Sequence, residues 1–128
     1  MQISPSALFN VAGGAVLGAC ARYLLNVALL HFWAHRFPWA TLLVNLVGCF
    51  SAGVLLALLL RGGISDNVRL FWVTGFLGAL TTFSAFSVET LTLLQNAEPL
   101  RAGINVVANV GGSLLLVVLG HALAKQFI

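Results

Sequence analysis

The sequence predicts an all-α membrane protein with four transmembrane helices per subunit, on the basis of three observations. Of the 128 residues, 60% are hydrophobic and only 7% are charged, whereas about 25% of the residues in a soluble domain are charged. Four apolar stretches are long enough to cross a hydrocarbon core of roughly 30 Å, which takes about 20 helical residues. The connections between them are short, so consecutive helices run antiparallel. We therefore expect residues 1–128 to form a single four-helix transmembrane domain, with helices near residues 8–30, 39–60, 70–94 and 100–123.

The first segment contains two glycines for close helix contact and one charged residue at membrane depth. Gly14 and Gly18 form a GxxxG pair, which lets another backbone approach closely. Arg22 lies beside them, about 12 Å from the end of the segment at a rise of about 1.5 Å per residue. Either its side chain extends to the membrane surface, or it is buried in protein and needs carbonyl or acidic partners. We assign all three residues a structural role.

The second and fourth segments each carry polar residues on one helical stripe. These residues are Thr41 and Asn45 in the second segment, and Asn105, Asn109 and Ser113 in the fourth. A carboxamide in the middle of a membrane must face protein or water. It either makes an interhelical hydrogen bond without a transport role, worth about 0.6 to 2 kcal/mol, or lines a polar pathway. So much polar surface in one small bundle exceeds what simple helix contact requires.

The third segment combines a helix-breaking composition with a polar and aromatic face. Residues 74–89 read TGFLGALTTFSAFSVE. Backbone that leaves a helix at membrane depth is tolerated only inside protein or beside a watery cavity, so we expect a break over residues 75–82 that marks a functional site. After it, a face about 120° wide carries Thr82, Phe83, Phe86, Glu89 and Thr90. Phenylalanines at this spacing commonly contact lipid or core, and Glu89 alone could mark the approach to the helix end. Because the phenylalanines share their face with Thr and Glu side chains, which lipid would not accept, we favour a pore.

The basic residues predict no preferred orientation in the membrane. With a cytoplasmic N-terminus, three lie inside and three lie outside. The inside residues are Arg61, Arg69 and Lys125, and the outside residues are Arg22, Arg36 and Arg101. Because orientation follows an asymmetry in this count, we expect the chain to insert both ways. Oppositely oriented copies would then pair as an antiparallel homodimer with a two-fold axis in the membrane plane.

Composition argues against several classes of function. Lys and Arg are scattered singly, so there is no basic patch for nucleic acid. Cys20 and Cys49 lie in apolar runs without a CxxC pair or a neighbouring His, which favours a packing role over metal or redox chemistry. No nucleophile stands beside a base, and we expect no catalytic residue and no enzyme. The donors that remain are carboxamides, hydroxyls and the positive edges of Phe rings, which suit a small, hard anion.

Motifs in three of the segments are specific enough to identify a family. They are GFLGALTTFSAFSVET in the third segment, TLLVNLVG in the second and GGAVLGACARY in the first. Together they closely resemble the Fluc/CrcB family of bacterial fluoride channels, and all four segments match in order and loop length. The resemblance implies a fluoride-selective channel of the bacterial inner membrane that exports fluoride passively. It further implies two antiparallel pores in a dual-topology homodimer, with fluoride, sodium, the lipid bilayer and a second copy of the chain as partners.

The resemblance also assigns roles to individual residues. The pore phenylalanines correspond to Phe83 and Phe86, and the pore asparagine corresponds to Asn45. Further candidates along the pore are Ser84, Ser87, Ser113 and Glu89, to which we add Asn109 from the polar stripe. A structural Na⁺ ion at the centre of the dimer is implied, held by the backbone carbonyls of Gly78 and Thr81. Asn105 departs from the family pattern, because some relatives carry Tyr there. Without an ion, hydroxyls of Thr81, Thr82 and Ser84 would have to cap the break.

Two other classes of membrane protein remain as alternatives. A small dual-topology multidrug exporter has four helices of similar length but centres on a carboxylate in its first helix, where this chain has Arg22 and no acid. A membrane scaffold without transport would need neither a helix break nor aligned donors. Proton dependence distinguishes the exporter from the channel, and any ion flux excludes the scaffold.

Overall fold

The computed structural model describes residues 4–32 and 37–127, and each regular element within these ranges is a helix. In chain order the elements are α1 (Pro5–Phe32), α2 (Trp39–Leu60), α3 (Asp66–Arg69), η1 (Leu70–Leu77), α4 (Gly78–Leu80), α5 (Phe83–Gln95) and α6 (Pro99–Phe127). Arg36, which contributes to the count of basic residues above, lies outside the described residues. Four runs are long and apolar enough to cross a membrane: α1, α2, residues 66–95 and α6. The four predicted segments are therefore confirmed.

The third run begins earlier than predicted because its start is capped. Ser65 has extended backbone, and its hydroxyl accepts a hydrogen bond from the backbone N–H of Val68. Asp66 follows in the first turn, where its negative charge interacts favourably with the positive end of the helix dipole. A Ser–Asp pair of this kind is typical of the start of a helix. The first turn therefore lies before the apolar run rather than inside it.

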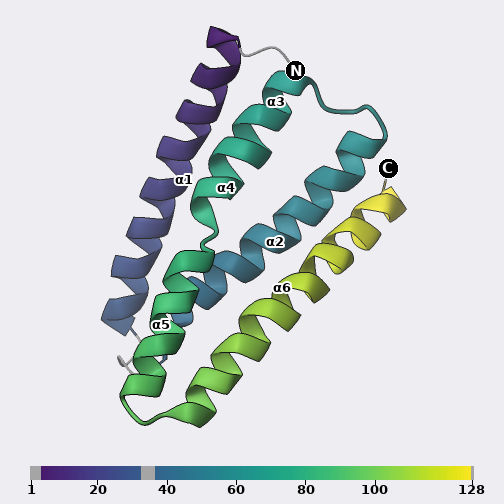
Figure 1. Ribbon diagram of the computed structural model, residues 1–128. Helices are drawn as coiled ribbons and strands as arrows, with labels where there is room; N and C mark the ends of the chain where they lie inside the picture. The colour runs from purple at the N-terminus through teal and green to yellow at the C-terminus, as the bar shows by residue number, and fades with distance from the viewer. Residues whose placement is uncertain (1–3, 33–36, 128) are drawn as a thin grey trace.

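The helices associate in pairs (Figure 1). α1 packs along η1 and α4, α2 packs along α6, and α5 lies against α6. Glycines allow the closest approaches between helices. A Cβ at Gly14 or Gly18 would overlap a backbone carbonyl oxygen of η1. A Cβ at Gly53 would overlap the carbonyl oxygen of Val117 on α6. Gly120 on α6 makes the reciprocal approach to α2. Small residues therefore set the distance between helices in both pairs.

The first half of the third span is a π-helix, which the sequence analysis did not anticipate. Over η1 the backbone hydrogen bonds reach five residues back, as in the bond from the N–H of Gly78 to the carbonyl of Val73. π-helical turns are rare in proteins, and those that occur often lie at functional sites. Gly75 lies within η1 against α1, where an added Cβ would come within 3.0 Å of the Cα of Gly14.

The span loses its helical backbone only at Thr81 and Thr82, which is a narrower interval than the expected 75–82. α4 continues to Leu80, then Thr81 (φ −77°, ψ 152°) and Thr82 (φ −150°, ψ 118°) are extended before α5 begins. The expectation that residues 75–80 leave the helix is wrong. Gly75 serves close contact with α1, and Gly78 has an ordinary helical conformation.

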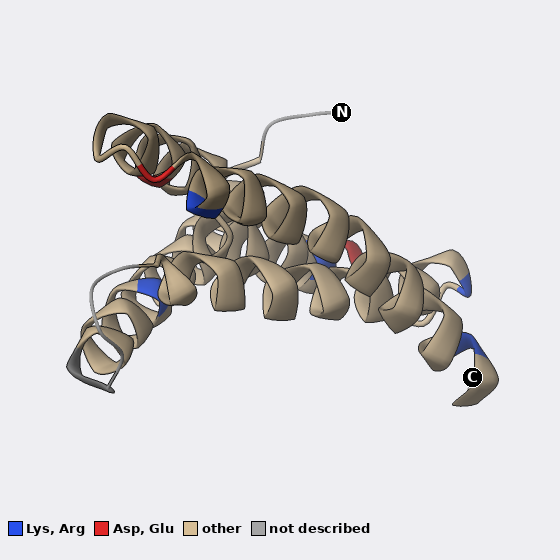
Figure 2. Cartoon of the chain, turned by 90° about the horizontal axis from the view of Figure 1, so that it is seen from below, with Lys and Arg blue, Asp and Glu red and all other residues tan. Residues whose placement is uncertain are grey.

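The interior is small, and much of the apolar surface faces outward. Val44, Leu77 and Leu80 form a buried cluster where α2 meets η1 and α4. Large apolar side chains on the other faces are exposed, as expected for helices surrounded by lipid. Charged residues are sparse along the ribbon (Figure 2). Arg101 pairs with Glu98 at 2.7 Å, at the start of α6.

Candidate functional site

A groove of about 300 Å³ opens beside the extended residues of the third span. Its lining comes from α2, α5, α6 and the connection between α4 and α5. The lining residues are Asn45, Cys49, Thr81, Thr82, Phe83, Phe86, Asn109, Val110, Ser113 and Leu114. Five of the predicted pore residues thus meet in one place: Asn45, Phe83, Phe86, Asn109 and Ser113.

Phe83 and Phe86 form an aromatic pair at the start of α5. Their ring centroids are 5.1 Å apart and their planes are inclined by 63°, so that one ring presents its edge to the other. Phe86 is buried, whereas Phe83 is 75% exposed. The edge of an aromatic ring is electropositive, and both rings line the groove.

Asn45 holds the extended backbone in place from α2. Its Oδ1 accepts a hydrogen bond from the backbone N–H of Thr82 at 2.8 Å, and its Nδ2 donates to the carbonyl of the same residue at 3.2 Å. Nδ2 also donates to Oδ1 of Asn109 at 2.9 Å. One buried carboxamide therefore satisfies both polar groups of the Thr82 backbone, which water would satisfy in a soluble protein.

Hydroxyl groups satisfy further backbone atoms at the interruption. Oγ1 of Thr82 accepts from the N–H of Ala85 at 3.2 Å and caps α5. Oγ1 of Thr81 donates to the carbonyl of Leu77 at 2.9 Å. The Thr82 and Ser84 hydroxyls lie 3.2 Å apart. The three hydroxyls that sequence analysis named as possible caps therefore all take part in hydrogen bonds here.

The backbone around Gly78 fits a hard monovalent cation in one respect. In a continuous helix the N–H of Thr82 would donate to the carbonyl of Gly78, but here it donates to Oδ1 of Asn45. That carbonyl consequently lacks its donor from the next turn, and carbonyl oxygens are ligands that hard cations prefer. No group of three or more His, Cys, Asp or Glu gathers within residues 4–32 and 37–127.

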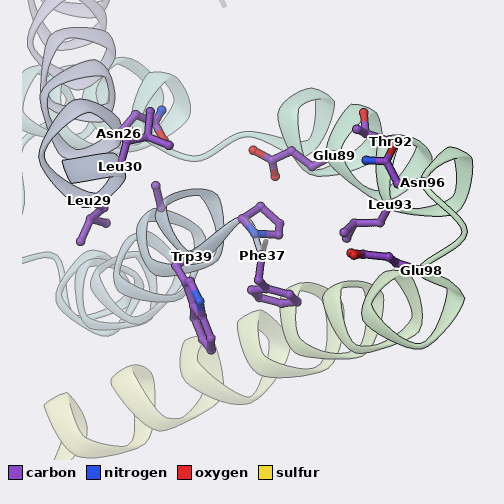
Figure 3. A pocket seen from close by; sticks show the side chains of 12 residues that line it. Asn26, Leu29, Leu30, Phe37, Trp39, Glu89, Thr92, Leu93, Asn96 and Glu98 are labelled. Carbon is purple, nitrogen blue, oxygen red and sulfur yellow. The ribbon is translucent and has the colours of Figure 1, made fainter. Parts of the chain in front are cut away.

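Glu89 lines a second, larger cavity of about 630 Å³ rather than the groove. Figure 3 shows its carboxylate pointing toward the side on which Asn26 and Leu30 of α1 lie. One carboxylate oxygen, Oε1, accepts a hydrogen bond from the hydroxyl of Thr41 at 2.5 Å. The other, Oε2, is buried without a hydrogen-bond partner in the part of the chain that the structure describes.

The remaining predicted residues lie outside the groove lining. Ser84 and Ser87 are exposed, and Ser87 donates back to the carbonyl of Phe83 at 2.8 Å. Arg22 is half-buried on α1 and lines neither cavity. Gly14 and Gly18 lie against η1 and α4, as described above.

Two features of the site escaped sequence analysis: the place of Cys49 in the groove lining and the hydrogen bond between Asn105 and Asn109. Cys49 lines the groove, although its apolar surroundings in the sequence suggested packing alone. Asn105 is fully buried and bonds to Asn109 through Oδ1. The spacing of four residues between these two asparagines places them on neighbouring turns of one helix face, and that signal is visible in the sequence.

Comparisons with known proteins place the chain in a family. The family model described as "CrcB-like protein, Camphor Resistance (CrcB)" matches residues 9–121. A protein of Shewanella halifaxensis named "Fluoride-specific ion channel FluC" is 44% identical over 116 residues, which cover 91% of this chain and 93% of that protein. "Fluoride-specific ion channel FluC 2" of Bradyrhizobium diazoefficiens is 43% identical over 122 residues, covering 93% and 89%. A third relative, from Rhizobium etli, is 42% identical over 118 residues, covering 91% and 94%.

These relatives match nearly the whole length of the chain. They are named as ion channels, which agrees with the expectation that the protein is not an enzyme. The family suspected from the motifs of the first, second and third segments is therefore confirmed. By the match over residues 9–121 and the identity to these relatives, this chain belongs to the CrcB-like family.

Proposed function

We propose that this protein is a fluoride-selective ion channel that exports fluoride passively across the bacterial inner membrane. The observation that carries the proposal is the groove in which Asn45, Asn109 and Ser113 meet the Phe83–Phe86 pair. The names of the relatives support fluoride as the ion.

The chemistry of the groove favours a small anion over a cation. Its polar lining consists of carboxamides, hydroxyls and aromatic edges, and Glu89 lies in the other cavity. Donors without fixed positive charge can replace the water around an anion yet let it leave again. A larger anion such as chloride would reach fewer of these donors at hydrogen-bond distance. An inside-negative potential drives an anion outward at about 2.3 kcal/mol per 100 mV, so export needs no other energy source.

We further propose that two copies assemble as an antiparallel, dual-topology homodimer with two pores. Phe83 lines the groove yet is 75% exposed, and a second subunit would cover it. The balanced count of basic residues supports insertion in both orientations. Exposed polar groups such as Ser84 and Ser87 would then lie along the pores, with Glu89 toward one end.

A structural Na⁺ ion at the centre of this dimer is a third proposal. Gly78 and Thr81 would hold it through their backbone carbonyls, two from each subunit. The ion would neutralise the repulsion among four converging carbonyl dipoles. Support comes from the Thr82 N–H, which bonds to Asn45 rather than to the carbonyl of Gly78, so that this carbonyl lacks its usual donor from the next turn.

Fluoride efflux from liposomes that contain only this protein tests the function. We expect fluoride to leave fluoride-loaded vesicles when a potassium ionophore supplies compensating charge, and to stay inside without it, because passive flux of an anion is electrogenic. Chloride should leave far more slowly in matched vesicles. Equal release of chloride, or flux that requires a proton gradient, would contradict the proposal, and the second result would favour a proton-coupled exporter.

A further inference from the structure

One line of side-chain hydrogen bonds runs from the groove into the contact between α5 and α6. Asn45 Nδ2 donates to Asn109 Oδ1, and Asn109 Nδ2 donates to Asn105 Oδ1, each at 2.9 Å. Asn105 Nδ2 then donates to Oγ1 of Thr90 at 2.9 Å. Thr90 Oγ1 donates to the carbonyl of Phe86 at 2.8 Å. We call Asn45, Asn109, Asn105 and Thr90 the amide chain.

The amide chain has a single direction, and both of its ends enforce that direction. At the groove, the backbone N–H of Thr82 can only donate, so Asn45 must present its oxygen there. At the other end, the hydroxyl hydrogen of Thr90 goes to the carbonyl of Phe86, so its oxygen can only accept from Asn105. A carboxamide turned by about 180° within the chain would bring two NH₂ groups or two oxygens together. Each carboxamide therefore fixes the orientation of the next.

Asn105 cannot take part in the pore by direct contact. Its exposed fraction is 0%, and it is absent from the lining of both cavities. Its side chain reaches the groove only through Asn109, whose NH₂ group bonds to both Oδ1 and the backbone carbonyl of Asn105. Any influence of Asn105 on an ion must pass along the amide chain.

We propose that Asn105 and Thr90 are positioning residues of the pore, which act through Asn109 on the Asn45 carboxamide and so on the Thr82 backbone. This inference rests on the proposed fluoride channel. Thr82 directly precedes Phe83, so the Asn45 carboxamide bonds the backbone next to the first ring of the aromatic pair. Without Asn105 or Thr90, the carboxamide of Asn109 loses the side-chain anchor that selects its orientation. A turned Asn109 would place its NH₂ group against that of Asn45, which the Thr82 N–H holds in place.

Threonine variants on α5 give a matched test. Thr90→Val removes the acceptor at the end of the amide chain with little change in shape, and Thr90→Ser restores a hydroxyl. Thr92→Val is the control, because Thr92 donates back to Val88 at 2.9 Å, as Thr90 does to Phe86. Thr92 is exposed, lies outside the amide chain and lines the larger cavity rather than the groove. Asn105→Leu interrupts the chain at a second point.

The readouts are fluoride efflux from liposomes and the fluoride-to-chloride permeability ratio from reversal potentials. We expect Thr90→Val and Asn105→Leu to lower fluoride flux about tenfold, which corresponds to about 1.4 kcal/mol, and to lower the permeability ratio. Thr90→Ser and Thr92→Val should keep both at the level of the unsubstituted protein.

Three outcomes would overturn the inference. Thr90→Val and Asn105→Leu could both match the unsubstituted protein in flux and ratio. Thr92→Val could lose as much fluoride flux as Thr90→Val. Thr90→Ser could also lose flux, although it keeps the hydroxyl. Either result would show general destabilisation rather than positioning. Lack of fluoride flux in the unsubstituted protein would instead refute the proposed function itself, so the two failures are distinguishable.

Discussion

Replacing Gly18 by alanine tests the close approach of α1 to the third span. An added Cβ would overlap the carbonyl oxygen of Phe76, a backbone atom that cannot rotate away. In an open helix position, Gly→Ala stabilises by about 0.5–1 kcal/mol, whereas overfilling a well-packed site costs about 1–3 kcal/mol. The difference predicts that Gly18→Ala lowers the free energy of unfolding by about 1 kcal/mol, a roughly fivefold change in the ratio of folded to unfolded protein.

Gly103→Ala is the matched control for this experiment. Gly103 is also helical, on α6, but a Cβ there would meet nothing within 4 Å. Reversible unfolding can be followed by far-UV circular dichroism in mixed micelles with increasing SDS. Gly18→Ala should unfold at a lower SDS fraction than the unsubstituted protein, and Gly103→Ala at the same or a higher fraction. If Gly18→Ala proves as stable as Gly103→Ala, steric overlap is not what governs this helix contact.

Three further predictions concern the pore, the ion and the orientation. Phe83→Ile and Phe86→Ile should sharply lower fluoride flux in liposomes while the protein stays folded, because Ile keeps much of the volume but lacks an electropositive ring edge; normal flux in both would exclude the pair from the pore. Replacing sodium by a large organic cation throughout purification should weaken the dimer in size-exclusion chromatography, and an unchanged dimer would favour a break capped by hydroxyls alone. Two or three Lys added at the C-terminus should abolish flux unless a copy biased to the opposite orientation is coexpressed.

The helices and most of the groove were predictable because they depend on two properties of the sequence, the length of its apolar runs and the helical spacing of its polar and aromatic residues. Apolar length located the four spans. Helical spacing brought Asn45, Asn109 and Ser113 onto faces that meet, as the lining of the groove shows. Spacing also placed Phe83 and Phe86 on one side of α5, and they form a ring pair there.

Other properties depend on contacts that spacing within one helix cannot reveal. The π-helical geometry of η1 has no sequence signature, and the glycines of the third span were interpreted as helix breakers when Gly75 serves contact with α1. The separation of Glu89 from the groove arises because Thr41 binds its carboxylate on the side of the larger cavity. The role of Asn45 as a partner of the Thr82 backbone requires α2 and the third span to be seen together.

The interruption at Thr81 and Thr82 divides one membrane span between two helix pairs. Its first half, η1 and α4, packs on α1, and its second half, α5, packs on α6. Contiguous helices that pack together tend to open and close as a unit, so amide hydrogen exchange should fall into two cooperative groups that part at these two residues. The carboxamide of Asn45 bonds the backbone where the groups meet, and the groove therefore lies at the boundary between the two groups.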